Sequence, residues 1–210
     1  QEISWDFKVT GNYNYNWGKE NYISPFKFTK DWLLIGNILG DARHYYTPDK
    51  LITKIEFNEN NKTKIQRTSG TETETYSFKM NRQLILTHKF TKTFTTKYDL
   101  QINSNLDQFK DNKWAIVKSM NIGRIDGITE KFTNTFKPEF MSWLNPEVTF
   151  NPTYSWGLNI LSDTLTADIK SSATFRTKVG LNLQDFIELI YTPDNKNKST
   201  GRGRGRGRGN

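Results

Sequence analysis

The chain contains no cysteine, only two histidines and no long apolar run. The lack of cysteine excludes disulfide bonds and thiolate metal sites, and it is compatible with a location in the cell envelope. His44 and His88 are too few and too far apart in sequence to predict a metal site. No run of about eighteen apolar residues occurs, so the sequence predicts no membrane-spanning helix.

Motifs of catalysis are missing as well. The sequence has no nucleophile elbow, no phosphate-binding loop and no cluster with metal-ligand spacing. Its acidic residues are scattered and are expected to be solvated. We therefore predict a protein that is not an enzyme, with no catalytic residue, no metal and no cofactor. The chain starts at Gln1, directly before a strand pattern and without a leader pattern, and we interpret it as a processed product or a piece of a longer polypeptide.

The composition is unusual for 210 residues. Only 34% of the residues are apolar and the mean hydropathy is −0.75, yet aromatic residues reach 14%. So many rings argue against a disordered chain. Few aliphatic residues beside many aromatic residues, threonines and asparagines indicate β-structure with one buried or lipid-facing side. Transmembrane barrels have this composition because half of each strand faces a polar lumen.

The clearest pattern is strict alternation near the start of the chain. From Ile3 to Trp17, the odd positions are aromatic or aliphatic apart from Gly11, and the even positions are all polar. Successive side chains of a strand point to opposite faces. This segment therefore predicts a long strand with one apolar face and one polar face.

The same alternation returns along the chain and predicts an antiparallel all-β fold. One hairpin is expected from 76–86 and 94–106, and a second from 128–136 and 148–158. A turn near Ser162 and Asp163 leads into a further strand over 165–179. Residues 51–57 are another strand candidate. Pro152 cannot donate a ladder hydrogen bond, so we expect a bulge there.

The remaining segments divide the chain into three parts. Residues 1–180 are expected to form barrel-wall strands, interrupted by polar excursions near 18–50, 58–74 and 107–127. Residues 58–74 suit either a loop or a strand extension into water. Apolar residues at helical spacing predict a short amphipathic helix over 181–192. Residues 193–210, which end in Gly-Arg repeats, predict a flexible loop or tail.

Several alternating runs reach thirteen to sixteen residues, and a tilted membrane-crossing strand needs about 9–11. We therefore predict an antiparallel transmembrane β-barrel segment with aromatic girdles at the lipid interfaces. The predicted membrane-facing residues are Trp5, Phe7, Val9, Tyr13, Tyr15, Trp17, Tyr76, Phe78, Phe94, Tyr98, Leu100, Ile102, Phe132, Phe136, Val148, Phe150, Tyr154, Trp156, Ile169 and Phe175. The predicted lumen-facing residues are Asp6, Lys8, Asn12, Asn14, Lys97, Asp99, Asn103, Thr149, Asn151 and Thr153.

Two other classes of protein remain open at this point. A secreted β-sandwich or adhesin-type binding module also has alternating strands, with the apolar sides of two sheets packed together. A weaker alternative is an RNA-binding protein that acts through its Gly-Arg tail. That tail has no aromatic residues between its repeats, so a nucleic-acid partner is not expected.

Segments across residues 20–192 resemble the strand pairs of the SprA/Sov family. The resemblance rests on 41–51, 76–82, 90–100, 136–146 and 153–156, which are loose strand-and-turn patterns. Members of that family are very large outer-membrane translocons of the type IX secretion system and are needed for gliding motility. The family's proteins are about ten times longer than this chain, so 210 residues would supply only a fraction of such a barrel.

The resemblance implies a giant barrel in the bacterial outer membrane whose lumen passes folded cargo proteins. The implied partners are outer-membrane lipid, the remainder of the parent barrel, accessory secretion-system subunits and the exported cargo. Transport of this kind requires no active-site chemistry. We expect the isolated chain to need detergent or to aggregate, because only a closed barrel lacks sheet edges.

Overall fold

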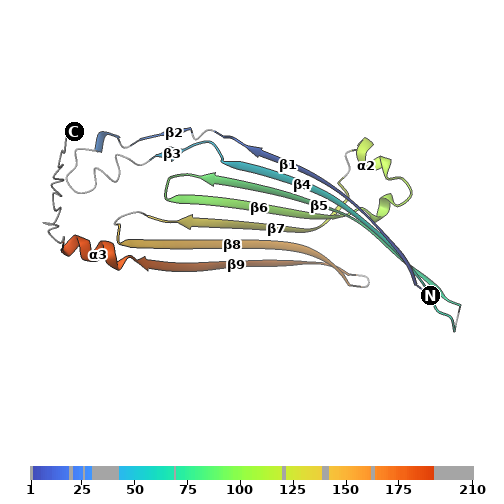
Figure 1. Ribbon diagram of the computed structural model, residues 1–210. Coiled ribbons are helices and arrows are strands. Elements are labelled where there is room, and N and C mark those ends of the chain that lie inside the picture. The colour runs from blue at the N-terminus through green and yellow to red at the C-terminus, as the bar shows by residue number, and fades with distance from the viewer. Residues whose placement is uncertain are drawn as a thin grey trace, which may run out of the picture.

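A computed structural model describes residues 2–18, 21–25, 27–29, 43–68, 70–119, 122–138, 142–161 and 164–191. Its main element is one antiparallel sheet of seven strands in the order β1-β4-β5-β6-β7-β8-β9 (Figure 1). These strands are β1 (Glu2–Asn16), β4 (Lys50–Ile65), β5 (Glu72–Lys89), β6 (Phe94–Asn105), β7 (Arg124–Phe136), β8 (Leu144–Leu161) and β9 (Thr164–Leu181). The prediction of an antiparallel all-β fold is confirmed.

Both predicted hairpins are present. β5 pairs with β6 and β7 pairs with β8, and β9 continues the sheet from β8. The β5–β6 turn is held by Thr91, whose Oγ1 accepts hydrogen bonds from the backbone N–H groups of Thr93 and Phe94. The predicted turn at Ser162 and Asp163 lies outside the described residues.

The expected bulge at Pro152 is wrong. The register of β8 with both neighbours is unchanged on either side of Pro152. The ladder with β7 instead lapses between the pairs Lys131–Thr153 and Asn134–Phe150, so the missing proline donor is accommodated without an extra residue. The register shift lies elsewhere, between Asn103 and Ser104 where β6 pairs with β7.

Two of the predicted polar excursions contain strand. β4 and β5 continue through most of 58–74, and a turn joins them after Ile65, as the strand-extension reading expects. In 107–127, β7 already begins at Arg124. The rest of that excursion holds the 3₁₀ turn η2 (Asp107–Phe109) and the helix α2 (Trp114–Ser119).

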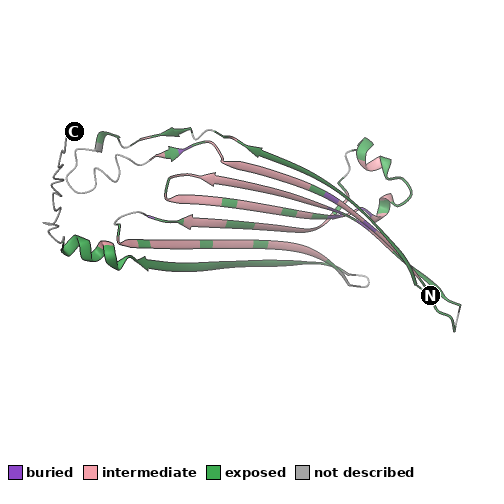
Figure 2. Ribbon diagram, in the orientation of Figure 1, coloured by how far each residue is buried: buried purple, intermediate pink, exposed green. Residues whose placement is uncertain are grey.

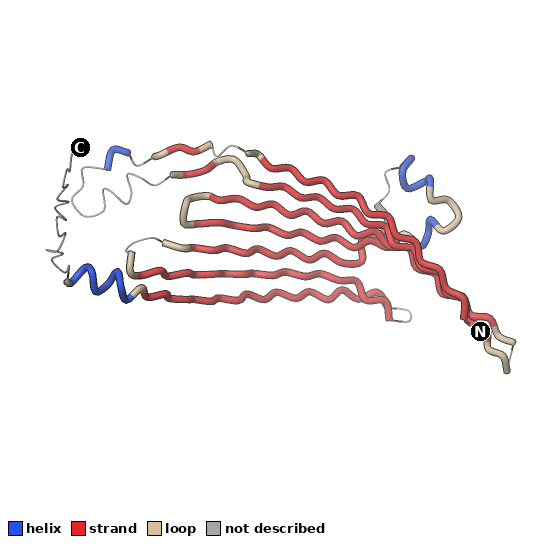
Figure 3. The backbone as a smooth tube through the Cα atoms, viewed as in Figure 1, coloured by secondary structure: helices blue, strands red, loops and turns tan. Residues whose placement is uncertain are grey.

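Short elements flank the main sheet. Within 18–50, β2 (Tyr22–Ile23) pairs with β3 (His44–Tyr45), and a 3₁₀ turn, η1, spans Lys27–Thr29. The predicted C-terminal helix is confirmed as α3 (Leu183–Ile190), whose N-terminus is capped by the Asn182 side chain. Figure 3 places α2 and α3 at opposite ends of the sheet. The tail over 193–210 lies outside the described residues.

The main sheet is a single layer with very little buried core (Figure 2). Apart from Pro138, only four apolar residues of the described part are buried: Tyr45, Phe78, Met80 and Leu106. In that part of the chain, β1 pairs only with β4 and β9 only with β8, so the sheet is open at both edges. None of the described helices is long and apolar enough to cross a membrane.

Candidate functional site

The two faces of the seven-stranded sheet are the candidate functional surfaces. Residues directly opposite each other on antiparallel strands project to the same face. Val9 lies opposite Phe57, and Phe57 lies opposite Met80. The ladder continues in the same way through Tyr98 and Phe132 in the middle of the sheet, and through Phe150 and Phe175 at its far edge. In each of the seven strands, the alternate positions that are mainly apolar therefore lie on the same face of the sheet, which we name the apolar face.

Every predicted membrane-facing residue within a strand lies on the apolar face. Phe7 and Phe150 have 54% and 42% of their surface exposed to the surroundings, so no described element covers them. Trp17, which follows β1, packs its ring edge-on against Tyr15 at 4.9 Å between ring centroids. Phe78 differs, because it is only 6% exposed. Phe78 therefore contacts other parts of the protein, whereas the sequence predicted that it faces the membrane.

The opposite face is polar, and every predicted lumen-facing residue lies on it. Asp6, Lys8, Asn12 and Asn14 of β1 share this face with Lys97, Asp99 and Asn103 of β6 and with Thr149, Asn151 and Thr153 of β8. Ile52 and Ile85, which lie opposite each other, are two apolar residues on this face. We name this surface the polar face.

The polar face carries more cations than acids. Its strand acids are Glu2, Asp6, Glu56, Asp99, Asp126, Glu147 and Asp168. Its strand cations are Lys8, Lys50, Lys54, Lys62, Lys64, Lys79, Lys89, Lys97, Arg124, Lys131, Lys170, Arg176 and Lys178. This surplus of positive charge makes the face strongly hydrated and mildly attractive to anions.

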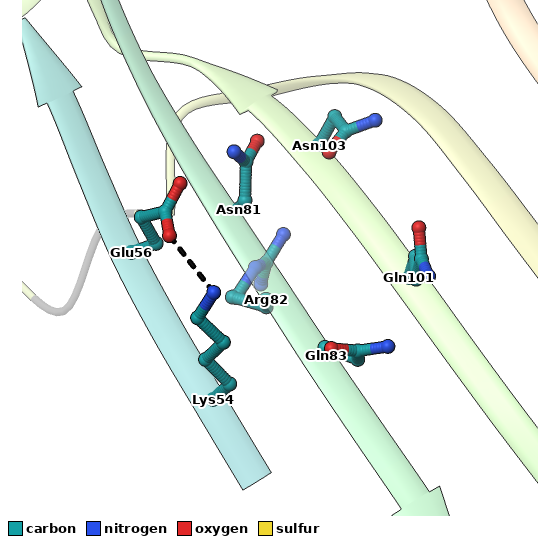
Figure 4. A pocket seen from close by; sticks show the side chains of 7 residues that line it. All are labelled: Lys54, Glu56, Asn81, Arg82, Gln83, Gln101 and Asn103. Carbon is teal, nitrogen blue, oxygen red and sulfur yellow. Dashed lines mark ion pairs between the residues drawn. The ribbon is translucent and has the colours of Figure 1, made fainter. Parts of the chain in front are cut away.

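A shallow depression of about 180 Å³ lies on the polar face, over β4, β5 and β6 (Figure 4). Four amide side chains line it, those of Asn81, Gln83, Gln101 and Asn103. At its side, Glu56 forms ion pairs with Lys54 at 2.9 Å and Lys8 at 3.1 Å. Amides and paired charges bind water well and offer no ring on which a ligand could stack. The depression therefore suits a wetted wall better than a pocket for one small molecule.

Two charged side chains interrupt the apolar face in its middle. Arg82 lies between Ile55 and Ile102 in the ladder, and its Nη2 donates a hydrogen bond to Ser104 Oγ at 2.8 Å. Glu130 lies opposite Leu100 and Tyr154. Both side chains are half-buried. An Arg stem packs against apolar neighbours while its guanidinium remains hydrogen-bonded.

One end of the apolar face is covered by the β6–β7 excursion, defined as residues 106–119 and 122–123. Leu106 is fully buried and packs with Phe78 and Met80. Phe109 and Ile116 complete this cluster from the excursion side. This segment, predicted as a polar excursion, therefore contributes apolar contacts to a small core. The apolar residues of the excursion are few and irregularly spaced, so the sequence showed no periodicity from which those contacts could be predicted.

Hydrogen bonds fix the excursion to the sheet. Asp107 Oδ1 accepts the backbone N–H of Phe78 at 2.6 Å, and the Leu106 N–H donates to the Phe78 carbonyl at 2.7 Å. Lys113 pairs with Glu59, and Lys110 pairs with Glu74 at 2.8 Å. The Glu74 carboxylate raises the pKa of Lys110 through that hydrogen bond. The covered end of the apolar face is thus a built contact between β4, β5 and the excursion.

Gly123 is the tightest point of the excursion. Its φ is +71°, and a Cβ there would overlap the Asn105 carbonyl oxygen and Leu106 Cδ2. We expect Gly123→Ala to cost about 2–5 kcal/mol, which combines left-handed strain with a contact that the backbone cannot relieve. Unfolding by denaturant in detergent micelles measures that cost.

Gly70→Ala is the matched control for Gly123. Gly70 has φ of +65° but no atom within 4 Å of the added Cβ, so only the backbone strain of about 1–2 kcal/mol applies. Equal losses at Gly70 and Gly123 would show that the close packing of the excursion contributes nothing.

An aromatic cluster marks the other end of the apolar face. His88 stacks on Phe90 at 4.1 Å, and Phe90 stacks on Phe94 at 5.7 Å. His88 Nε2 is 3.0 Å from the Tyr45 carbonyl oxygen, which ties the cluster to β3. Of these residues only Phe94 was predicted as membrane-facing. Residues 88, 90 and 94 are all at even-numbered positions, and this shared alternation could have indicated that His88 and Phe90 lie on the same face as Phe94. These contacts give His88 a structural role beside the β5–β6 turn.

The described residues contain no group of three or more His, Cys, Asp or Glu that could hold a metal ion. No protein-family model matches the chain, and no curated protein matches it at a significant level.

Proposed function

We propose that this chain forms part of the wall of a protein-conducting β-barrel in the bacterial outer membrane, as the resemblance to the SprA/Sov translocon implies. The apolar face contacts lipid, and the polar face lines a water-filled passage for folded cargo proteins. The proposal rests mainly on the division of one seven-stranded sheet into an apolar face, which is covered by protein only at one end, and a polar face. A lipid-facing strand requires this arrangement, because lipid covers the apolar side that no protein layer covers.

Strand length supports the proposal. The main-sheet strands have 12 to 18 residues, whereas strands of globular proteins usually have about 5–6. Crossing the hydrocarbon core takes about 9–11 residues at the tilt found in barrels. The strands are therefore long enough to cross the membrane and to project beyond it. In Figure 1 the β4–β5 hairpin extends past the ends of β6, β7, β8 and β9.

The two open edges support a larger assembly. β1 and β9 are the first and seventh strands of an antiparallel sheet, so they run in the same direction. They cannot pair antiparallel with each other, and barrels of this class contain antiparallel strands. Backbone groups at a sheet edge must be paired inside a membrane. Closure therefore takes further strands, which we assign to the remainder of a parent barrel.

The polar face suits a passage for protein cargo. Hydroxyl, amide and ammonium groups keep water on the wall, and the scarcity of apolar groups there gives a passing polypeptide little to adhere to. No catalytic step is proposed. Gating, energy supply and accessory subunits belong to other parts of the secretion system.

No observation favours the sandwich alternative over a membrane wall. A sandwich requires a second sheet about 10 Å from the apolar face. Within the described part of the chain, the only other sheet is the two-stranded pair β2–β3, which is too short to cover seven long strands. The alternative through RNA binding rests on the Gly-Arg tail, which lies outside the described residues.

Single-cysteine spin labels test the proposal without background, since the chain has no cysteine. With the chain in lipid bilayers, labels at Phe7, Tyr98 and Phe150 are expected to be relaxed by oxygen, which concentrates in lipid. Matched labels at Lys8, Asp99 and Asn151 on the polar face are expected to be relaxed by a water-soluble nickel chelate.

The opposite outcome is equally definite. If the three apolar-face labels are shielded from both reagents, in a chain that stays monomeric in water without detergent, the membrane-wall proposal is wrong and the sandwich becomes the better description.

A further inference from the structure

The helix α2 exposes apolar side chains away from the sheet. Trp114 is 81% exposed and Val117 is 68% exposed, while Ile116 on the same helix packs toward the small core. Ile122, just beyond the helix, is also exposed. The contacts of Ile116 therefore fix α2 with one side on the sheet and leave Trp114 and Val117 on its outer side.

The helix α2 lies on the apolar side of the sheet, beside the ends of β6 and β7. The excursion stands on the apolar face, since it covers Phe57, Phe78 and Met80. It also leaves the sheet where β6 ends at Asn105 and returns where β7 begins at Arg124. Figure 1 shows α2 projecting from the sheet at this end. A helix on the lipid side of the wall and beside the strand ends lies at the level where hydrocarbon gives way to water.

Charged residues lie on both sides of Trp114 in the sequence. Lys113 pairs with Glu59 and Lys110 pairs with Glu74, and Asp111 on the same segment is exposed. Lys118, in the last turn of α2, has no acidic partner within the described residues. A Trp ring beside a free ammonium group matches the headgroup layer, where rings of mixed polarity concentrate and phosphates bind lysine.

We propose that the β6–β7 excursion is an interfacial anchor that inserts Trp114 and Val117 into the lipid headgroup layer, with Lys118 bound to lipid phosphate. This inference rests on the proposed function, because it requires lipid against the apolar face. The anchor fixes the height of this part of the wall. The charged contacts on the sheet side of the excursion hold it in place.

The test uses the full chain in bilayers with an environment-sensitive fluorophore on single cysteines. The label at Val117→Cys is expected to be quenched by a nitroxide at the lipid headgroup several-fold more strongly than by one at the end of an acyl chain. A label at Phe150→Cys is expected to show the reverse preference. A label at Thr68→Cys, in the exposed β4–β5 turn, is expected to be quenched by neither lipid nitroxide.

The outcomes separate the anchor from the membrane wall. If Phe150→Cys is quenched in the acyl region while Val117→Cys behaves like Thr68→Cys, the anchor is wrong and the wall proposal stands. If neither Val117→Cys nor Phe150→Cys is quenched, the wall proposal itself fails. Adding Trp114→Ser should reduce quenching at Val117→Cys several-fold and leave Phe150→Cys unchanged. Unchanged quenching at Val117→Cys would overturn the role given to Trp114.

Discussion

Replacement of Phe150 by arginine is expected to destabilise the chain in a bilayer by about 2–4 kcal/mol. Phe150 lies on the apolar face within β8, between Asn134 of β7 and Phe175 of β9. No acidic side chain is among these neighbours to pair with the new charge. Moving a guanidinium to the middle of a lipid-facing barrel surface carries a cost of this size. A loss of about 30- to 1,000-fold in the folding equilibrium corresponds to it, measured by denaturant titration in vesicles.

Asn151→Arg is the matched control for Phe150→Arg. Asn151 is the next residue of β8 and lies opposite Thr174 on the polar face. The same arginine there remains in water and is expected to change stability by less than about 0.5 kcal/mol. If Asn151→Arg and Phe150→Arg destabilise equally, the two faces do not differ in solvent, and the assignment of lipid to one of them is wrong.

Replacement of Lys113 by methionine is expected to release the β6–β7 excursion from the sheet. Lys113 Nζ lies 2.5 Å from Glu59 Oε2, and the Glu59 side chain is only 4% exposed. Tyr76 Oη donates to the other carboxylate oxygen at 2.9 Å. Without Lys113, the buried carboxylate keeps one hydrogen bond and no cation. We expect a loss of about 2–3 kcal/mol, below the roughly 3–5 of a fully buried pair, because Lys113 is half exposed.

Amide hydrogen exchange measures this loss of stability at the contact between the excursion and the sheet. The amides of Phe78 and Leu106 are bonded across the contact, and their exchange in Lys113→Met is expected to speed up by about 30- to 150-fold. Lys62→Met is the control, since Lys62 pairs with Glu2 at 2.6 Å but both side chains are about half exposed. Exposed pairs add little. Equal effects of Lys62→Met and Lys113→Met would mean that the buried pair does not hold the excursion.

Much of the sheet follows from local pattern. The alternation around Phe94 to Ser104, and again around Val148 to Leu158, marked strands whose pairing partners were their nearest neighbours in sequence. Hairpins require little more than two alternating runs and a polar turn. The helix α3 followed from the change of period after Leu181 and is capped by Asn182.

Two predictions from the local sequence pattern, those for Pro152 and Phe78, differ from the structure because of contacts with distant parts of the chain. Pro152 suggested a bulge because it has no backbone N–H to donate. In the structure Pro152 lies where β8 makes no ladder pairs with β7, and this gap depends on β7 and not on the sequence around Pro152. Phe78 has the parity of a lipid-facing residue, yet Leu106 and Ile116 cover it. Those residues come from a segment with no strand or heptad period, so nothing in the spacing linked them to Phe78.

The sequence alone determined which residues of each strand share a face, because side chains in extended backbone alternate with a period of two. Strand order, the register that aligns seven apolar parities on one face, and the folding of the excursion back onto that face were decided only by the tertiary structure. The reason is that these features depend on contacts between residues far apart in the chain, such as Lys113 with Glu59 and Gly123 with Asn105, and no local periodicity encodes such contacts.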